Sequence, residues 1–422
     1  SGGAVTVDQL SHISTLGDNS TAITARSYSS AGTGGSVDVF VDGSTSTGDL
    51  LQGTGDDSFG LFAQSVGPIG GGPVTVEHRG SVDTVGDRAT GIYAQSDAGF
   101  GVGGAVTVFT GGNVETIGNE SNGVEAQSIG VGGGSVDVRN ARDVITRGES
   151  AKGVVAQSNG GPAAGGEVSV FVNKITWTEG NDSDGIIAES KGGFGAGDVQ
   201  VVSSSVWTHG SESGGIEANS KAGSGSAGTV MVSAKGSTVT VGSNSAAISA
   251  LSRGNTSSGD ILVNKDGNIR TRGENSDGIS ALSLSAEGTS GNIQIDADGG
   301  VITKGGYSTA VLATSAGAVS AGDVSAFITG DITTEGRLSS GMKLHSLSDF
   351  GQAGDVTGVV SGDLQTEGSL SGGILARSYG YGQAGNVLVQ QFGSLNTLGF
   401  KGNGVFAESR SDSMQSGLVD VT

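Results

Sequence analysis

Apolar and polar residues alternate along short stretches of this chain, and three such stretches recur in a fixed order. The first has the form Gly-aliphatic-x-Ala-x-Ser, as in Gly123-Val-Glu-Ala126-Gln-Ser128. The second is Val-x-Val, as in Val106-Thr-Val108, and the third is aliphatic-x-Thr-x-Gly, as in Val114-Glu-Thr116-Ile-Gly118. A period of two is typical of a β-strand with one buried face, and none of the three stretches has a helical period. We therefore expect three short strands in every repeat.

The repeat has a nearly constant length of about 31 residues. The serine that ends the first stretch marks each copy, and these serines are Ser27, Ser65, Ser96, Ser128, Ser158, Ser190, Ser220, Ser252, Ser283, Ser315, Ser346, Ser378 and Ser409. Self-similarity at this period is typical of a solenoid, in which each coil buries its apolar face only against its neighbours. Residues 1–422 are therefore predicted to form a single continuous solenoid, although the length alone would suggest several globular domains.

Three strands in each repeat, with glycine at the corners, predict an all-β fold of the parallel β-helix (β-solenoid) type. We expect about 31 residues and three strands per coil, and about 13 coils. Each strand would pair with its counterpart one repeat later, about 4.8 Å away. Inward aliphatic side chains would form the core, and buried Ser and Thr hydroxyls would bond along the stack. The pattern leaves open whether these hydroxyls face inwards or cap the corners.

A glycine stands two residues before every Val-x-Val stretch, for example Gly35, Gly104 and Gly385. Such regularity within one chain indicates a backbone position that only glycine accepts. The residue would need either a positive φ or space for a close approach of another segment of backbone. Both explanations remain open from the sequence.

The first interval between marker serines is longer than the others, since Ser27 and Ser65 are 38 residues apart. We assign the extra residues to Phe40–Gly48 and expect a bulged corner loop there. Loops that project from a solenoid wall often carry binding residues. The alternative is an insertion that the fold tolerates without any function.

The composition supports a folded solenoid and argues against a nucleic-acid partner. With 81 glycines and 3 prolines the chain resembles a low-complexity linker, yet 34% of its residues are hydrophobic and these occupy fixed places in the repeat. The net charge is −21, with only 21 Lys and Arg residues. Affinity for nucleic acid comes mainly from cations that displace counterions, so we expect no nucleic-acid partner.

The chain has no cysteine, so neither disulfides nor thiolate metal sites are expected. No run of 18 apolar residues occurs, and the chain opens with Ser-Gly-Gly, so we expect no membrane insertion of this segment and no signal peptide within it. Both ends cut the repeat at the same phase and carry no polar cap. We therefore expect a segment of a longer repeat protein, or a module that stacks end to end.

Nothing in the chain predicts catalysis, a cofactor or a metal site. The histidines occupy unlike places in their repeats; they are His12, His78, His209 and His345. Carboxylates occur as close pairs at Asp56-Asp57, Asp182-x-Asp184 and Asp296-x-Asp298, and such pairs can cleave glycosidic bonds. Here they lie in turns or on strand faces without aromatic platforms or the long loops that form a cleft. We therefore expect a protein that is not an enzyme.

The outward positions of the first stretch suggest a partner surface. Seven of them place apolar groups where water would be expected: Phe62, Tyr93, Val155, Ile187, Leu312, Leu375 and Phe406. Rows of exposed apolar side chains can mark a surface that binds a partner. The next outward column begins with four successive glutamines, Gln64, Gln95, Gln127 and Gln157, whose amides would form a ladder. The alternative is that wall-to-wall stacking or a glycine-rich corner covers these groups.

The Ala-Gln-Ser motif followed by a glycine-rich run resembles the passenger-domain repeats of large Gram-negative autotransporters. Two examples are Ala126-Gln-Ser-Ile-Gly-Val-Gly-Gly-Gly134 and Ala156-Gln-Ser-Asn-Gly-Gly160, and the resemblance covers essentially the whole chain. It implies a parallel β-helix exported by type V secretion and displayed on the bacterial outer surface. The membrane barrel, signal peptide and caps of that family are not in this sequence. No functional residue carries over, because the matching positions are structural.

These observations favour a non-catalytic extracellular surface rod that acts in adhesion, aggregation or biofilm attachment. Its partners would be a host or bacterial cell surface, a polysaccharide, or other copies of itself, and many weak contacts would raise its avidity. A self-assembling structural fibre or surface-layer component is the alternative. A polysaccharide-acting β-helix enzyme is the least favoured hypothesis.

Overall fold

The computed structural model describes all residues from 1 to 422. The chain forms two compact units, Ser1–Gly210 and Ser211–Thr422. Each unit consists of three parallel sheets and contains no helix, so each is a parallel β-solenoid, and the predicted fold class is confirmed. Together the units carry about 13 coils of about 32 residues. That residues 1–422 form one continuous solenoid stays a prediction.

In the first unit each recurring stretch forms one sheet, named here after its sequence. The Val-x-Val wall consists of β1 (Val5–Gln9), β4 (Val37–Val41), β7 (Val74–His78), β10 (Val106–Thr110), β13 (Val136–Asn140), β16 (Val168–Val172) and β19 (Val199–Ser203). The threonine wall consists of β2 (Ile13–Thr15), β5 (Thr45–Thr47), β8 (Val82–Val85), β11 (Val114–Ile117), β14 (Val144–Arg147), β17 (Thr176–Glu179) and β20 (Val206–His209). The Ala-x-Ser wall consists of β3 (Ile23–Tyr28), β6 (Leu61–Gly67), β9 (Ile92–Ala98), β12 (Val124–Ile129), β15 (Val154–Asn159) and β18 (Ile186–Gly192).

The second unit has the same three walls. Its Val-x-Val wall consists of β22 (Val230–Lys235), β25 (Ile261–Asp266), β28 (Ile293–Asp298), β31 (Val324–Ile328), β34 (Val356–Val360), β37 (Val387–Gln391) and β40 (Val419–Val421). Its threonine wall consists of β23 (Thr238–Val241), β26 (Ile269–Arg272), β29 (Val301–Lys304), β32 (Ile332–Thr334), β35 (Leu364–Thr366) and β38 (Leu395–Thr397). Its Ala-x-Ser wall consists of β21 (Ile216–Ala222), β24 (Ile248–Gly254), β27 (Ile279–Ser285), β30 (Val311–Gly317), β33 (Met342–Ser348), β36 (Ile374–Gly380) and β39 (Val405–Ser411).

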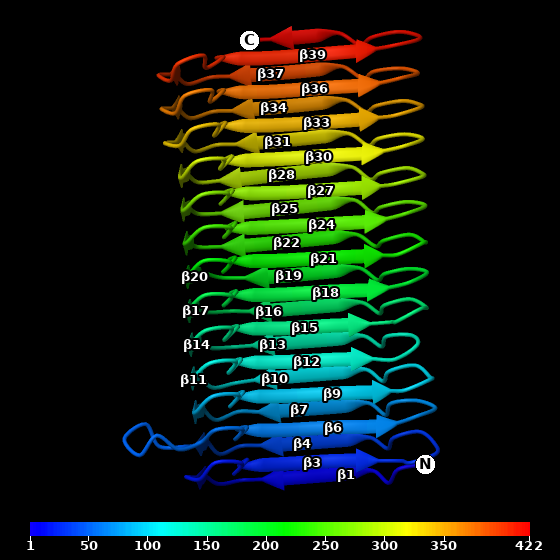
Figure 1. Ribbon diagram of the computed structural model, residues 1–422, viewed down its shortest axis with the longest axis vertical. Coiled ribbons are helices and arrows are strands. Elements are labelled where there is room, and N and C mark those ends of the chain that lie inside the picture. The colour runs from blue at the N-terminus through cyan, green and yellow to red at the C-terminus, as the bar shows by residue number, and fades with distance from the viewer. The chain divides into compact units, whose positions relative to one another are not determined.

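Strands of consecutive coils pair in parallel and in the same register of the repeat. In the first unit β9 pairs with β12 so that Ala94 lies opposite Ala126 and Ser96 opposite Ser128, and Figure 1 shows these strands one above the other. The inward residues of each strand form the core, as the period of two predicts. Ile92, for example, has no exposed surface, and burying a side chain of this size contributes about 1.5–3 kcal/mol before entropy is subtracted.

The serine of the Ala-x-Ser wall holds two walls and two coils together. The Ser96 hydroxyl accepts a hydrogen bond of 2.8 Å from the N–H of Gly104, in the corner that follows it, and donates one of 2.8 Å to the carbonyl of Gly72 in the preceding coil. The same pair of bonds recurs at Ser128 and Ser252. These hydroxyls therefore face inwards, and they bond to the backbone of the corners instead of forming a hydroxyl ladder.

The invariant glycine of this corner is explained by close approach and not by a positive φ. Gly104 lies outside the left-handed region, but a Cβ atom on it would be 2.5 Å from the carbonyl carbon and oxygen of Gly72. The glycine that ends the third stretch meets both conditions. Gly118 has a φ of 143°, and a Cβ atom there would lie 2.0 Å from the carbonyl oxygen of Gly86. Backbones of consecutive coils thus touch at both corners.

The turn after the threonine wall contains a non-glycine residue in the left-handed region in every coil, with φ between 53° and 60°. These residues, named here the crest, are Asn19, Asp57, Arg88, Glu120, Ser150, Asp182, Glu212, Asn244, Asn275, Tyr307, Leu338, Leu370 and Lys401. Buried hydroxyls stabilise the turn: Thr116 donates to the carbonyl of Ser121 at 2.6 Å, and the Ser121 hydroxyl accepts a bond of 2.9 Å from the N–H of Ala89 in the preceding coil. This backbone conformation costs about 1–3 kcal/mol per residue, which these bonds offset.

The extra residues of the first interval lie elsewhere than predicted. Phe40 belongs to β4, and Thr45–Thr47 form β5, which pairs in register with β8. The insertion is residues 49–54, whose ends pair as an antiparallel bridge between Asp49 and Thr54. Figure 1 shows it as the blue loop that projects beside β4 and β6. The prediction was wrong because the wall strands keep their register and the crest turn takes up the added length.

Replacing Ser96 by Ala should lower the stability of the first unit, because the N–H of Gly104 and the carbonyl of Gly72 would both lose a buried partner. Leaving buried polar groups unpaired costs about 1–3 kcal/mol. The free energy of unfolding in urea, followed by circular dichroism, measures this loss. Ser169→Ala, on the outer side of β16, is the matched control. Equal effects of the two variants would contradict the role assigned to Ser96.

Replacing Gly104 by Ala should destabilise the same unit by about 1–3 kcal/mol or more, since overpacking forces the backbone to shift. Gly99→Ala is the control within the same corner, because the atom nearest to its added Cβ is the Cα of Pro68 at 3.5 Å, an ordinary contact. Thermal unfolding of the two variants gives the comparison. A Gly104→Ala variant as stable as Gly99→Ala would show that close approach does not restrict this column.

Candidate binding face on the Ala-x-Ser wall

The structure places all the predicted partner-surface residues on the outer side of the Ala-x-Ser walls. In the first unit these are Phe62 on β6, Tyr93 on β9, Val155 on β15 and Ile187 on β18; in the second they are Leu312 on β30, Leu375 on β36 and Phe406 on β39. This face is sheltered for an outer surface: Val155 is only 5% exposed, and Phe406, the most exposed member, is 37% exposed. The structure therefore confirms the outward direction, while the role in partner binding stays a prediction.

An aromatic cluster occupies this face in the first unit. The rings of Phe62 and Tyr93 stack with centroids 5.2 Å apart, and Phe59 packs against both at 5.3 and 5.7 Å. Burial, together with the nearby carboxylates of Glu125 and Asp97, raises the pKa of Tyr93 well above its ordinary value. Phe59 lies in the segment before β6, outside the alternating pattern, so the sequence did not single it out.

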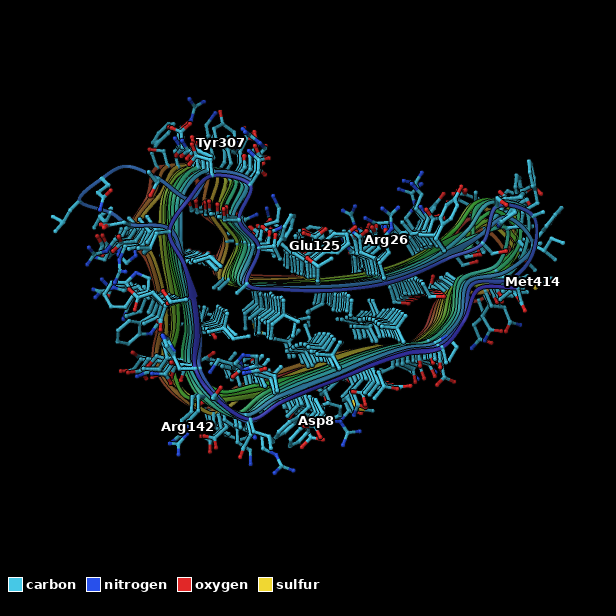
Figure 2. All side chains as sticks on the ribbon, turned by 90° about the horizontal axis from the view of Figure 1, so that it is seen from below. Asp8, Arg26, Glu125, Arg142, Tyr307 and Met414 are labelled. Carbon is cyan, nitrogen blue, oxygen red and sulfur yellow. The ribbon has the colours of Figure 1, made fainter.

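Polar residues continue the face beyond this cluster. The Glu125 carboxylate accepts hydrogen bonds of 2.7 Å from the side-chain amides of Asn122 and Gln127, and burial raises its pKa. Figure 2 shows Glu125 and Arg26 pointing outwards from the same wall, where the coil follows a re-entrant bend. This bend explains why outward groups are sheltered here.

The predicted glutamine ladder is confirmed. The amide of Gln64 donates to Gln95 at 2.6 Å, Gln95 donates to Gln127 at 3.1 Å, and Gln127 donates to Gln157 at 3.4 Å. The first three glutamines thus each donate to the glutamine of the next coil, and the column presents a hydrogen-bonded strip beside the aromatic cluster.

In the second unit the same face contains a pocket of about 310 Å³. Its rim is formed by the crest residues Leu338, Leu370 and Lys401, and its wall by Lys343, Leu375, Arg377 and Phe406. Between them lie Ser340, Gly372, Ile374 and Asn403. The pocket therefore combines three cations, an aromatic ring, leucine side chains and two polar groups from three consecutive coils.

The cations of this pocket differ in their partners. Arg377 lies 2.7 Å from a carboxylate oxygen of Glu408, and its guanidinium carbon lies 5.5 Å from the centre of the Phe406 ring. The Lys343 ammonium makes no hydrogen bond or ion pair within the chain, and the nearest carboxyl that interacts with its charge is the buried one of Asp277. The imidazole of His345 lies beside these cations, and burial, together with the charges of Arg377 and Lys343, lowers its pKa to about 4. The local potential is therefore positive in a chain with a net charge of −21.

A second pocket of the second unit, about 330 Å³ in volume, lies at the end of the Val-x-Val wall and is lined by Lys265, Asp296 and Asp298 among other residues. The ammonium of Lys265 donates hydrogen bonds of 3.0 Å to the carbonyls of both Asp266 and Gly267, and it also bonds the carbonyl of Gly236. Burial lowers the pKa of this lysine to about 8. With the side chain 2% exposed and its donors occupied, Lys265 stabilises the corner.

The other candidate groups for chemistry lie apart from one another. Asp57 is a crest residue, and its carboxylate pairs with Arg88 at 2.7 Å. His78 is buried between the hydroxyl of Thr45 and the carbonyl of Gly80. No group of three or more His, Cys, Asp or Glu side chains is arranged to hold a metal ion. No helix has the length and hydropathy needed to cross a bilayer.

Comparisons with known protein families, with curated proteins and with solved structures found no match for this chain.

The low pKa of His345 predicts a pH dependence of stability. The unfolded state binds a proton near the ordinary pKa of 6.5 and the folded state only near 4, so the contribution of His345 is present above pH 6.5 and is lost as the pH falls towards 4. His345→Gln should therefore lose less unfolding free energy than the unchanged chain over this range. Urea unfolding at several pH values gives the difference, and an imidazole that titrates near 6.5 by NMR would contradict the prediction.

Proposed function

We propose that this protein is a non-catalytic extracellular surface protein that acts in adhesion, aggregation or biofilm attachment through the outer face of its Ala-x-Ser walls. The observation that carries the proposal is the sheltered outward face itself, on which apolar and aromatic side chains recur in many coils, among them Phe62 and Tyr93 in the first unit and Leu375 and Phe406 in the second. Such a face offers many similar contacts, and repeated weak contacts raise avidity without any strong single site.

The distribution of fixed and variable positions supports a binding role over a catalytic one. Inward positions and corners keep the same residues along the chain, as at Ser96 and Ser128, because they hold the fold together. Outward positions vary freely between aromatic, aliphatic and charged residues. The corners are short apart from residues 49–54, so no long loops border a cleft of the kind that β-helix enzymes use. The proposed location, the bacterial outer surface, rests on the resemblance to autotransporter passenger repeats.

Beads coated with the purified chain should bind bacterial or host cells, and Phe62→Ser should weaken this binding. Phe171→Ser is the matched control, because Phe171 is a half-buried outward phenylalanine on the Val-x-Val wall of the same unit. Loss of one aromatic contact costs about 0.5–1.5 kcal/mol, and repetition multiplies the effect. Flow cytometry of cells with fluorescent beads measures the binding, and circular dichroism checks that both variants fold.

The fibre and enzyme hypotheses predict different results for the same purified chain. Sedimentation that depends on concentration, with no binding to cells, would replace adhesion by a self-assembling fibre or surface-layer component. Release of reducing sugars from a polysaccharide by the purified chain would overturn the non-catalytic assignment. Equal cell binding by Phe62→Ser and Phe171→Ser would show that the Ala-x-Ser wall is not the binding face.

A further inference from the structure

The pocket of the second unit differs from the rest of the face in its charge. Lys343, Arg377 and Lys401 line it; Glu408 pairs with Arg377, and the buried carboxyl of Asp277 lies close enough to Lys343 to interact with its charge. A chain of net charge −21 repels anions in general, so a local cluster of cations creates a site with the opposite preference. The ligand of this pocket should therefore be an anion.

Unused hydrogen-bonding groups define the ligand further. The ammonium of Lys343, the hydroxyl of Ser340 and the side-chain amide of Asn403 all line the pocket and make no hydrogen bond within the chain. Ser340 is 6% exposed, whereas Asn403 is an exposed residue. A sheltered hydroxyl such as that of Ser340 normally has a partner, and Lys343 and Asn403 add further donors beside it. This set would therefore accept a ligand that carries hydroxyl groups as well as a negative charge.

Apolar side chains form the rest of the pocket lining. Phe406 turns a half-exposed ring towards the pocket, and the side chains of Leu338, Leu370 and Leu375 lie around it. The volume of about 310 Å³ is at the lower end of the range of about 300–1,000 Å³ for small-molecule sites. A pyranose ring fits this lining, because it has an apolar face that packs on aromatic and aliphatic groups and hydroxyls that point to its edge.

We propose that this pocket binds an acidic sugar unit of a polysaccharide, of the hexuronate type. The sugar carboxylate pairs with the Lys343 ammonium, the apolar face of the ring packs on Phe406, and the ring hydroxyls bond Ser340 and Asn403. A fatty anion would satisfy the charge and the leucines, but it would leave the sheltered Ser340 hydroxyl unpaired, which costs about 1–3 kcal/mol, and it would gain no hydrogen bond from the Asn403 amide. A neutral sugar would gain no charge-assisted hydrogen bond from the Lys343 ammonium.

This inference rests on the proposed function in one respect, since it assigns a ligand to part of the same binding face. The two are tested by different measurements. Binding of a soluble sugar is measured on the purified full chain in solution, whereas adhesion is measured with coated beads and cells. Failure of the sugar to bind would leave adhesion through Phe62 and its neighbours intact, and failure of adhesion would leave the sugar site measurable.

The test is titration of the full chain with digalacturonate, followed by NMR, with its fully methyl-esterified form as the neutral control. Digalacturonate should bind, and the ester should bind at least about tenfold more weakly, because the charge-assisted bond to Lys343 is lost. Raising the salt concentration should weaken the binding of digalacturonate and not that of the ester. Laurate, the anionic amphiphile, should not compete.

Two substitutions locate the site. Lys343→Gln should weaken digalacturonate binding about tenfold, while Lys304→Gln, which removes a cation of the same unit from its threonine wall, should leave it unchanged. Phe406→Leu should weaken binding of both the acid and the ester, because both sugars pack on the ring. Thermal unfolding confirms that each variant is folded.

Three results would overturn the inference: equal affinity for digalacturonate and its ester, displacement of digalacturonate by laurate, or equal losses in Lys343→Gln and Lys304→Gln. No binding of digalacturonate at millimolar concentration would also overturn it.

Discussion

In-register hydrogen bonding between consecutive coils is the constraint on which the rest of each unit depends. Since Ala126 lies opposite Ala94 and Ser128 opposite Ser96, every position of a coil has a like position above or below it. A residue that suits one coil then suits the next, which is why the chain repeats. The corners are the most restricted positions, because the backbones of two coils meet there. The serine hydroxyl also has to bond the backbone N–H and carbonyl groups of the corner, as Ser96 does.

Most of the fold could be predicted from the sequence, because the strand backbone itself makes successive side chains point to opposite faces. The alternation of residues such as Val114 and Thr116 predicts both the strand and its buried side, and the structure agrees. The crest turn could not be predicted, because residues as different as Arg88 and Leu338 adopt the same left-handed conformation. The insertion was misplaced for a related reason: glycines at 43 and 48 resemble a corner, whereas the length was added at the crest, where the residue type is not fixed.

The candidate site was predicted only in part. The alternation of inward and outward positions identified Leu375 and Phe406 as outward residues, and the glutamine ladder followed from the common outward column of Gln64 and Gln95. The alternation along a strand distinguishes only inward from outward positions, however. It gives no information about the re-entrant bend that shelters this face. The pocket also joins residues about one repeat apart, such as Lys343 and Arg377. Whether they border one pocket depends on the position of the crest residues relative to the wall.

The crest has a consequence for how such a protein can change. Its backbone is fixed by buried hydroxyls such as those of Thr116 and Ser121, while its side chains range from Asn, Asp, Glu and Ser to Arg, Lys, Tyr and Leu. Chemical character at this edge is thus separated from the stability of the coil. New contacts can be gained or lost by single substitutions at the crest without altering the walls, so one scaffold can carry many different surfaces at low risk to folding.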